Sequence, residues 1–216
     1  MNIAIDGPAG AGKSTIAKKI AKQLGYIYVD TGAMYRAMAL YIVRCGIDPK
    51  DSVAISSRCN DADITIKYED GQQIVLLNGE NVNQYLRTEE VGNMASTTSA
   101  NGDVRKKLVA LQQKLAATTD VVMDGRDIGT VVLPNAEVKV YLTASSKVRA
   151  QRRYDELTAK GEMCDINKIE EDIIQRDHQD MTREISPLKK ADDATEVDSS
   201  YMTIDEVVDT IIAMTR

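Results

Sequence analysis

The chain has 216 residues, of which 43% are hydrophobic and 28% charged, an ordinary composition for a soluble globular protein. A net charge of -6 argues against broad binding to nucleic acids or membrane surfaces. The length suffices for one α/β domain with an insertion. Because the chain has nine Tyr but no Phe or Trp, we expect a core of aliphatic residues and Met.

The cysteines and the apolar runs indicate where the protein works. Cys45, Cys59 and Cys164 are far apart and odd in number, which favours free thiols in a reducing compartment. No signal-like run opens the chain, and no stretch approaches the roughly 18 apolar residues of a membrane span. We therefore expect a cytoplasmic protein without a membrane, nucleic-acid or obligate protein partner.

A glycine-rich loop of sequence GPAGAGKST lies between an apolar strand, Asn2 to Ile5, and a helical stretch, Ser14 to Leu24. This order is typical of a phosphate-binding loop. Glycines let backbone N–H groups surround an anion, and the helix start adds partial positive charge. We expect Lys13 to reach the outer phosphates of a nucleoside triphosphate and Ser14 to ligate Mg²⁺. The predicted ATP-binding residues are Gly7, Pro8, Ala9, Gly10, Ala11, Gly12, Lys13, Ser14 and Thr15.

After this loop, the pattern predicts a second strand at Tyr26 to Val29, a helix from the DTGAMYR segment to Cys45, and a helix over 50–60. Residues 62–86 differ, because alternating apolar positions are punctuated by Asp-Gly at 70–71 and Asn-Gly at 78–79. This pattern predicts a small antiparallel hairpin region inserted into the fold.

The second half of the chain continues the alternation of helices and strands. We predict strands at Asp120–Met123, Glu137–Leu142 and Thr195–Val197, and helices starting at Thr88 and Ser146, over 103–117 and 166–184, and from Thr203 to Met214. Five strands separated by helices favour an α/β fold with a doubly wound parallel sheet of the P-loop kinase type. We expect a single domain over 1–216, with its core in 1–60, 104–152 and 185–216, an antiparallel β insertion in about 61–103, and a helical lid in about 153–184.

Two classes of phosphate-loop protein compete, a GTP-driven switch and a kinase. A switch needs an Asn-Lys-x-Asp guanine reader after a strand, but Asn167 to Glu170 ends in Glu and lies in a charged helical stretch. A kinase needs an acceptor site, for which two segments follow strands at the carboxyl edge of the sheet. The first segment is Asp30 to Arg36 (DTGAMYR), in which Arg36 can clamp an acceptor phosphate. The alternative is that Arg36 is a solvated helix residue. The second, Asp124 to Asp127, carries Arg126 between carboxylates, and an ordinary turn is the alternative.

Five segments in this order resemble the bacterial cytidylate kinase family: GPAGAGKST, DTGAMYR, DGRDIGTVV, SSKVRAQRR and RDHQDMTREISPLKKADDA. The resemblance covers nearly the whole chain, including the hairpin insertion. It implies transfer of the γ-phosphoryl group of ATP to CMP or dCMP, with Mg²⁺ as cofactor, in pyrimidine metabolism. A kinase for another nucleoside monophosphate, or for a small metabolite such as shikimate or gluconate, is the alternative.

The resemblance also implies roles for individual residues in binding the acceptor. The implied ligands of the monophosphate are Thr31, Arg36 and Arg126. The implied cytosine readers are Ser96, Arg105, Asp127 and Arg183, and the implied ribose contacts are Arg176 and Asp180. The chemistry fits, because a carboxylate such as Asp127 accepts from the exocyclic amine of cytosine, where uracil presents a carbonyl. For Arg105 the alternative is a solvated helix face.

A phosphate acceptor is already a nucleophile and needs no general base, so catalysis must be positioning and charge neutralisation. The predicted catalytic residues are Lys13, Arg126, Arg149 and Arg153. Arg149, Arg152 and Arg153 share a helix face, and the alternative is pairing with Asp155 or Glu156. We also expect Asp124 to assist Ser14 in holding Mg²⁺ through water. The only histidine, His178, is expected at the surface.

Overall fold

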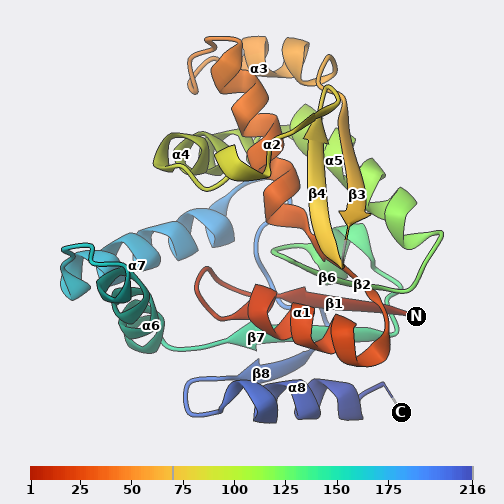
Figure 1. Cartoon of the computed structure of the whole chain (residues 1–216), viewed down its shortest axis with the longest axis vertical. Coiled ribbons are helices and arrows are strands. Elements are labelled where there is room, and N and C mark those ends of the chain that lie inside the picture. The colour runs from red at the N-terminus through yellow and green to blue at the C-terminus, as the bar shows by residue number, and fades with distance from the viewer. Residues whose placement is uncertain (70, 216) are drawn as a thin grey trace. The chain divides into compact units, whose positions relative to one another are not determined.

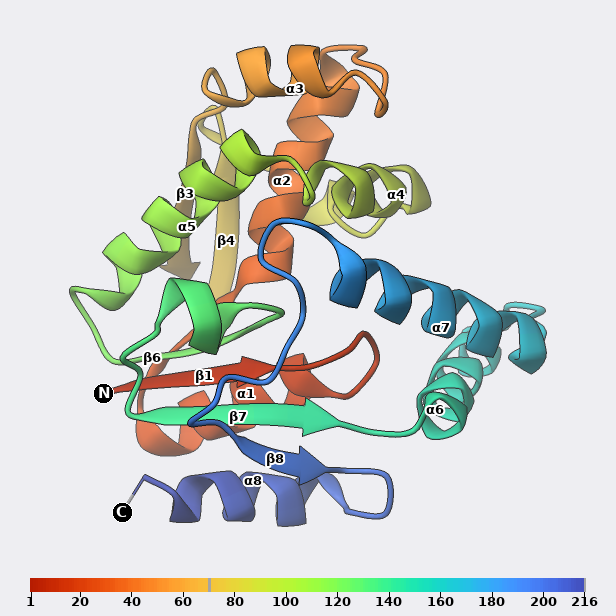
Figure 2. The same ribbon diagram turned by 180° about the vertical axis from the view of Figure 1, so that it is seen from behind.

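The computed structural model describes residues 1–69 and 71–215. The chain forms two compact units. Unit 1 combines Met1–Tyr26 with Asp120–Arg216, and unit 2 is the continuous segment Ile27–Thr119. Each unit is described by itself below (Figures 1 and 2).

A five-stranded parallel sheet is the framework of the fold, as predicted. Its strands are β1 (Asn2–Asp6), β2 (Ile27–Asp30), β6 (Val121–Gly125), β7 (Val138–Thr143) and β8 (Thr195–Asp198), in the order β2-β6-β1-β7-β8. In unit 1, β1 pairs with β6 on one side and β7 on the other. The strand order therefore reverses at β1, and the crevice outside the carboxyl ends at such a point is where ligands of open α/β sheets bind.

Helices of unit 1 cover this sheet. Helix α1 (Lys13–Leu24) packs against β6 and against α8 (Ile204–Ala213), and Figure 1 shows the two helices side by side. Helix α8 starts at the predicted residue, Thr203, with a reciprocal capping box to Glu206. The core contains no ring of Phe or Trp and is built from aliphatic residues and Met, among them Ile3, Ile5, Ile20, Met123 and Leu142.

Two further helices and a short π-helix complete unit 1. Helices α6 (Ser146–Ala159) and α7 (Ile166–Thr182) pack against each other beyond the carboxyl end of β7 (Figures 1 and 2). The π-helix η2 (Ile128–Val132) follows β6 after two intervening residues and contacts β1. The sequence analysis did not predict η2, because nothing in the pattern of DGRDIGTVV distinguishes a single π-turn from a loop.

Unit 2 contains the predicted hairpin insertion and four helices. Strands β3 (Ile64–Glu69), β4 (Gln72–Leu77) and β5 (Glu80–Asn81) form an antiparallel sheet in that order. The helices are α2 (Thr31–Arg44), α3 (Ser52–Cys59), α4 (Glu89–Thr98) and α5 (Gly102–Ala116), and η1 (Asn83–Tyr85) is a 3₁₀ turn. Helix α2 packs against α4 and β4 through a buried face that includes Met34, Met38 and Ile42.

The predicted turns and caps in unit 2 are largely confirmed. Asn78 and Gly79 link β4 to β5 with positive φ angles of 51° and 83°, as a two-residue hairpin requires. Thr88 accepts a hydrogen bond from the Val91 amide and starts α4. In the predicted Asp-Gly turn at 70–71, Asp70 lies outside the described residues.

Several boundaries of the predicted elements differ by one or two residues; the strand predicted at 120–123 is Val121–Gly125, and the helix predicted at 166–184 is Ile166–Thr182. The second strand is Ile27–Asp30 rather than Tyr26 to Val29, because the Tyr26 amide donates to the Ala21 carbonyl and closes α1. The following helix stops at Arg44, with Cys45 as its cap. Among the residues that the structure describes, no helix is long and apolar enough to cross a membrane.

Candidate functional site

The phosphate loop connects β1 to α1 at the point where the strand order reverses. Gly7 has φ 149°, and a Cβ atom there would overlap the carbonyl oxygen of Leu142, so only glycine fits. Gly12 caps α1 in the left-handed conformation with φ 89°, which places Lys13 in the first turn. The loop thus presents a helix N-terminus, with its partial positive charge, at the carboxyl edge of the sheet.

Lys13 is 6% exposed, and its Nζ donates to the Pro8 carbonyl at 2.7 Å. Burial, and then the positive charge of Arg126, lower the pKa of Lys13 from its ordinary value, while Asp124 and Asp6 oppose the shift. An ammonium group with a lowered pKa in a buried position is strongly stabilised by any anion that reaches it. The loop therefore carries a cation suited to phosphate oxygens.

Ser14 and Asp124 come together at the same edge of the sheet, as the sequence analysis expected. The Ser14 hydroxyl donates to Asp124 Oδ2 at 2.9 Å across 110 residues of sequence. Asp124 is buried at the end of β6, while Ser14 is exposed. A hydroxyl beside a carboxylate gives oxygen donors, which Mg²⁺ prefers.

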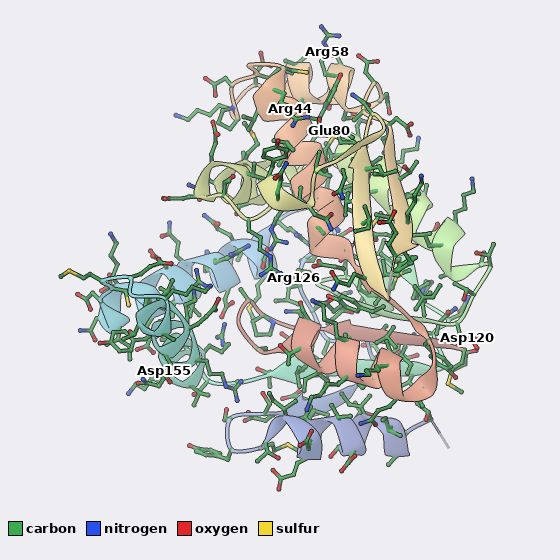
Figure 3. All side chains as sticks on the ribbon, viewed as in Figure 1. Arg44, Arg58, Glu80, Asp120, Arg126 and Asp155 are labelled. Atoms are coloured by element: carbon green, nitrogen blue, oxygen red, sulfur yellow. The ribbon has the colours of Figure 1, made fainter. Side chains whose placement is uncertain are left out.

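Four predicted substrate-binding residues of unit 1 gather after β6 and at the end of α7. Arg126, labelled in Figure 3, donates from Nε to Asp180 Oδ2 at 2.7 Å. Arg183 Nη1 lies 3.7 Å from Asp180 Oδ1, and its Nη2 lies 4.0 Å from Asp127 Oδ1. Asp127 is 4% exposed. Two cations thus alternate with two carboxylates, and a base or phosphate can exchange with these internal partners.

Arg149 is held by three hydrogen bonds, although it belongs to a highly charged helix. Its guanidinium group donates to the carbonyls of Ala144 and Ala9 at 2.8 and 2.9 Å, and to Asp177 at 2.6 Å. Because Ala9 lies in the phosphate loop, Arg149 is anchored directly beside that loop.

The other two arginines of α6 differ from Arg149. Arg152 donates to the carbonyl of Ser199, and Arg153 is exposed and pairs with Glu156 at 2.9 Å. The predicted shared helix face is therefore divided between a buried arginine and two exposed ones. The lid candidates Arg176 and His178 are also exposed on α7.

In unit 2, Thr31 and Arg36 lie at the start of α2. Thr31 is the first residue of the helix and is buried, and the Asp30 carboxylate accepts from the Ala33 amide at 2.9 Å. A Cβ atom on Gly32 would lie 3.4 Å from Arg36 Nη1, so the guanidinium group lies over the first helical turn. A helix N-terminus with an arginine over it is an arrangement suited to a phosphate.

The two predicted base readers of unit 2 have different exposures. Arg105 is 3% exposed, donates to the Ser99 carbonyl at 2.9 Å, and lies 5.3 Å from the centre of the Tyr35 ring. It is therefore not on a solvated helix face. Ser96 lies exposed on α4.

The structure adds two buried or half-buried carboxylates that the sequence analysis did not single out. Asp6 accepts hydrogen bonds from the amides of Ile128 and Gly129, and Asp177 pairs with Arg149. The sequence did contain one indication for Asp6, which lies at the end of an apolar strand directly before the loop. A charged residue buried in such a position needs a hydrogen-bond partner. Nothing in the sequence distinguished Asp177 from the other charged residues of its helix.

Comparisons with known proteins show the family to which the sequence is similar. The family model described as cytidylate kinase matches residues 3–216. A cytidylate kinase of Caldicellulosiruptor bescii is 50% identical over 214 residues, covering 99% of this chain and 95% of the relative. One from Lactobacillus johnsonii is 53% identical over 208 residues, covering 96% and 90%.

Solved structures show the fold at much lower sequence identity. A shikimate kinase of Bacteroides thetaiotaomicron has a TM-score of 0.50 at 13% identity, covering 100% of this chain and 98% of its own. An uncharacterized protein of Eubacterium ventriosum has a TM-score of 0.52 at 13% identity, covering 99% and 96%. The match of the family model to residues 3–216 and the relatives of 50% and 53% identity over nearly the whole chain show that the chain belongs to the cytidylate kinase family.

Proposed function

We propose that this protein transfers the γ-phosphoryl group of ATP to CMP or dCMP, giving ADP and CDP or dCDP. The observation that carries the proposal is the presence, in one unit, of the phosphate loop with buried Lys13 and of a buried Asp127 next to Arg183. The loop suits a triphosphate donor, and the carboxylate suits an acceptor base with an exocyclic amine.

The reaction needs no protein base in this arrangement. The monophosphate of the acceptor carries a charge of about -1.5 to -2 at pH 7, so its oxygen attacks without losing a proton to the protein. The protein's task is to bring two anions together and neutralise the charge that develops between them. Loop residues 7–15 hold the donor phosphates by backbone N–H groups, and Lys13 contacts the outer ones.

Mg²⁺ fits the residues present at the loop. Ser14 and Asp124 already share a hydrogen bond, so the hydroxyl can bind the ion directly while the carboxylate acts through water. Among the described residues no group of three or more acidic, His or Cys side chains could hold a metal ion. When bound, Mg²⁺ neutralises charge on the nucleotide phosphates.

The acceptor's phosphate and ribose are assigned to separate groups. In unit 2, Thr31 and Arg36 bind the phosphate from the start of α2. In unit 1, Arg126 binds phosphate by exchanging its partner Asp180, and Arg176 and Asp180 contact the ribose. An arginine suits this role because its planar fork gives two parallel hydrogen bonds to phosphate oxygens.

The acceptor's base is recognised by Asp127 and Arg183 in unit 1 and by Ser96 and Arg105 in unit 2. Asp127 accepts from the amine of cytosine, and the arginines donate to its ring carbonyl and nitrogen. UMP would direct a carbonyl at the carboxylate, leaving buried acceptors facing each other. Such a mismatch costs about 1–3 kcal/mol, or about 5- to 150-fold in selectivity.

Arg149 and Arg153 complete the proposed machinery on α6. Arg149 is already beside the loop and neutralises the transferring phosphoryl group, while Arg153 exchanges Glu156 for phosphate when residues of about 153–184 close as a lid. Closure excludes water and so limits idle hydrolysis of ATP. Residues of about 61–103 form the acceptor-binding insertion within a single P-loop kinase domain.

The decisive experiment measures ADP release with Mg-ATP and a panel of CMP, dCMP, UMP, AMP and shikimate. We expect turnover with CMP and dCMP and far less with UMP. If turnover with AMP, UMP or shikimate equals or exceeds turnover with CMP, the protein acts on another acceptor and the proposed substrate is wrong.

A variant then tests the base reader. Asp127→Asn is expected to lower the ratio of kcat/KM for CMP over UMP by about tenfold, because an amide donates as well as accepts. The matched control is Asp61→Asn, which changes a surface carboxylate paired with Arg58. An unchanged ratio in Asp127→Asn would contradict the assignment.

A further inference from the structure

Asp6 ends β1 immediately before the phosphate loop, yet its side chain does not contribute to that loop. One carboxylate oxygen accepts from the Ile128 amide at 2.8 Å, and the other accepts from the Gly129 amide at 2.7 Å. The residue is 5% exposed. Asp6 therefore uses both oxygens on the backbone of η2, more than 120 residues away in sequence.

The bonds from Asp6 reach the peptide unit that carries the predicted base reader. The Ile128 amide shares its peptide plane with the Asp127 carbonyl, which accepts from the amides of Val131 and Val132 at 2.9 and 3.2 Å. The plane between residues 127 and 128 is thus held at both ends. Because this plane is attached to the Cα atom of Asp127, it sets the direction in which the Asp127 side chain leaves the backbone.

Asp127 lies outside the two elements that flank it, although its carbonyl accepts from amides of η2. Strand β6 ends at Gly125 and η2 begins at Ile128, so Asp127 lies between the two elements with φ -143° and ψ 25°. Asp6 restrains this peptide by accepting hydrogen bonds from two adjacent amides, those of Ile128 and Gly129.

The surroundings of Asp6 show that its place is closely filled. A Cβ atom added at Gly129 would lie 3.4 Å from Asp6 Oδ2 and 3.3 Å from Lys139 Cδ. Residue 129 is therefore small enough to let its amide approach the carboxylate. A larger residue at position 129 would therefore displace Asp6 slightly without removing its charge.

From this geometry we infer that Asp6 is a positioning residue for base selection, fixing the direction of the Asp127 carboxylate through the amides of Ile128 and Gly129. This inference rests on the proposed function, in which Asp127 accepts from the amine of cytosine. Reading a base by one hydrogen bond requires the acceptor to be held within a fraction of an ångström. Asp6 supplies that restraint from the strand that also positions the phosphate loop.

The test is the variant Asp6→Asn, whose amide has one acceptor oxygen and one donor group for two N–H donors. One amide of η2 then loses its partner, and Asp127 is no longer held in one direction. We expect kcat/KM for CMP to fall by about tenfold and kcat/KM for UMP by less than about twofold, so that the preference for CMP falls at least about fivefold. The control is Asp193→Asn in the same unit, which replaces an exposed carboxylate that pairs with Lys139.

Gly129→Ala is the second variant, and it keeps the charge of Asp6 while crowding the same oxygen. It should lower the preference for CMP in the same direction by a smaller factor, even if Asp6→Asn fails to fold. A parallel loss of turnover with CMP and UMP in either variant, or an unchanged ratio in both, would overturn the inference. Failure of the wild-type protein to phosphorylate CMP would instead overturn the proposed function.

Discussion

Arg149 and Asp177 join helix α6 to helix α7 through an ion pair of 2.6 Å between two side chains that are 6% and 14% exposed. The same guanidinium group donates to the carbonyl of Ala9 in the phosphate loop. One planar cation therefore links α7 to the loop. Because Asp177 accepts from only one of its nitrogens, the movement of α7 that the proposed lid requires would leave Arg149 held by the carbonyls of Ala9 and Ala144.

The first prediction concerns Arg149→Lys. A lysine keeps the charge but cannot donate to Ala9, Ala144 and Asp177 at once, so its position beside the loop is lost. We expect kcat to fall by about 100-fold or more, with a smaller change in the KM for CMP. The comparison is with Lys147→Ala, an exposed change on the same helix, in steady-state kinetics. Near-normal kcat in Arg149→Lys would show that the fork geometry is not used.

The second prediction separates activity from stability at Lys13. Lys13→Met should lower kcat by at least about 1,000-fold, since both charge and reach are lost. Because burial lowers the pKa of Lys13 from 10.5 to about 7, the charged side chain destabilises the ligand-free protein fully below about pH 7, and the native state binds fewer protons than the unfolded state between about pH 7 and 10.5. This destabilisation disappears as pH rises toward 10.5.

Denaturant unfolding at several pH values checks that sign. The free energy of unfolding of Lys13→Met minus that of the wild type should be greatest near neutral pH and should decrease with rising pH, by at most about 1.4 kcal/mol per pH unit. Lys22→Met, on the exposed part of the same helix, should show no such trend. A flat difference for Lys13→Met would mean that its charge is not buried in solution.

The third prediction concerns the metal. Chelation of Mg²⁺ should abolish turnover, and re-addition should restore it. Ser14→Ala removes the hydroxyl that lies on Asp124, so we expect the Mg²⁺ concentration for half-maximal activity to rise roughly tenfold. Ser57→Ala, which changes an exposed hydroxyl in unit 2, is the control. An unchanged Mg²⁺ requirement in Ser14→Ala would remove Ser14 from the metal site.

The fourth prediction concerns Arg36. Because its guanidinium group lies over the first turn of α2, Arg36→Ala should raise the KM of every accepted monophosphate by a similar factor, about tenfold or more. The control is Arg44→Ala on the same helix, which removes a surface pair with Glu80, both labelled in Figure 3, and a contact with the Tyr85 ring. A selective effect of Arg36→Ala on one base would show that it reads the base instead of the phosphate.

The elements that form locally were predictable from the sequence. The loop at 7–15, the Asn-Gly turn at 78–79 and the caps at Thr88 and Thr203 depend on residues within a few positions of one another. Glycine permits positive φ, and a hydroxyl reaches an amide three residues on, wherever such a segment occurs. These local rules also supported the five strands, because each is a short apolar run between turn signals.

Only the tertiary structure decided which charged side chains meet. Asp6 binds the amide of Gly129 across 123 residues, and Arg149 binds Asp177 across 28. Many carboxylates on α7 were equivalent candidates in the sequence, and a strand-end aspartate gives no indication of its distant partner. The sequence by itself determined the loop, the strands and the family resemblance, because those depend on local backbone chemistry. The order of the strands and the packing of helices on them decided the pairing of charges, because contacts between distant residues arise only when the chain folds around its core.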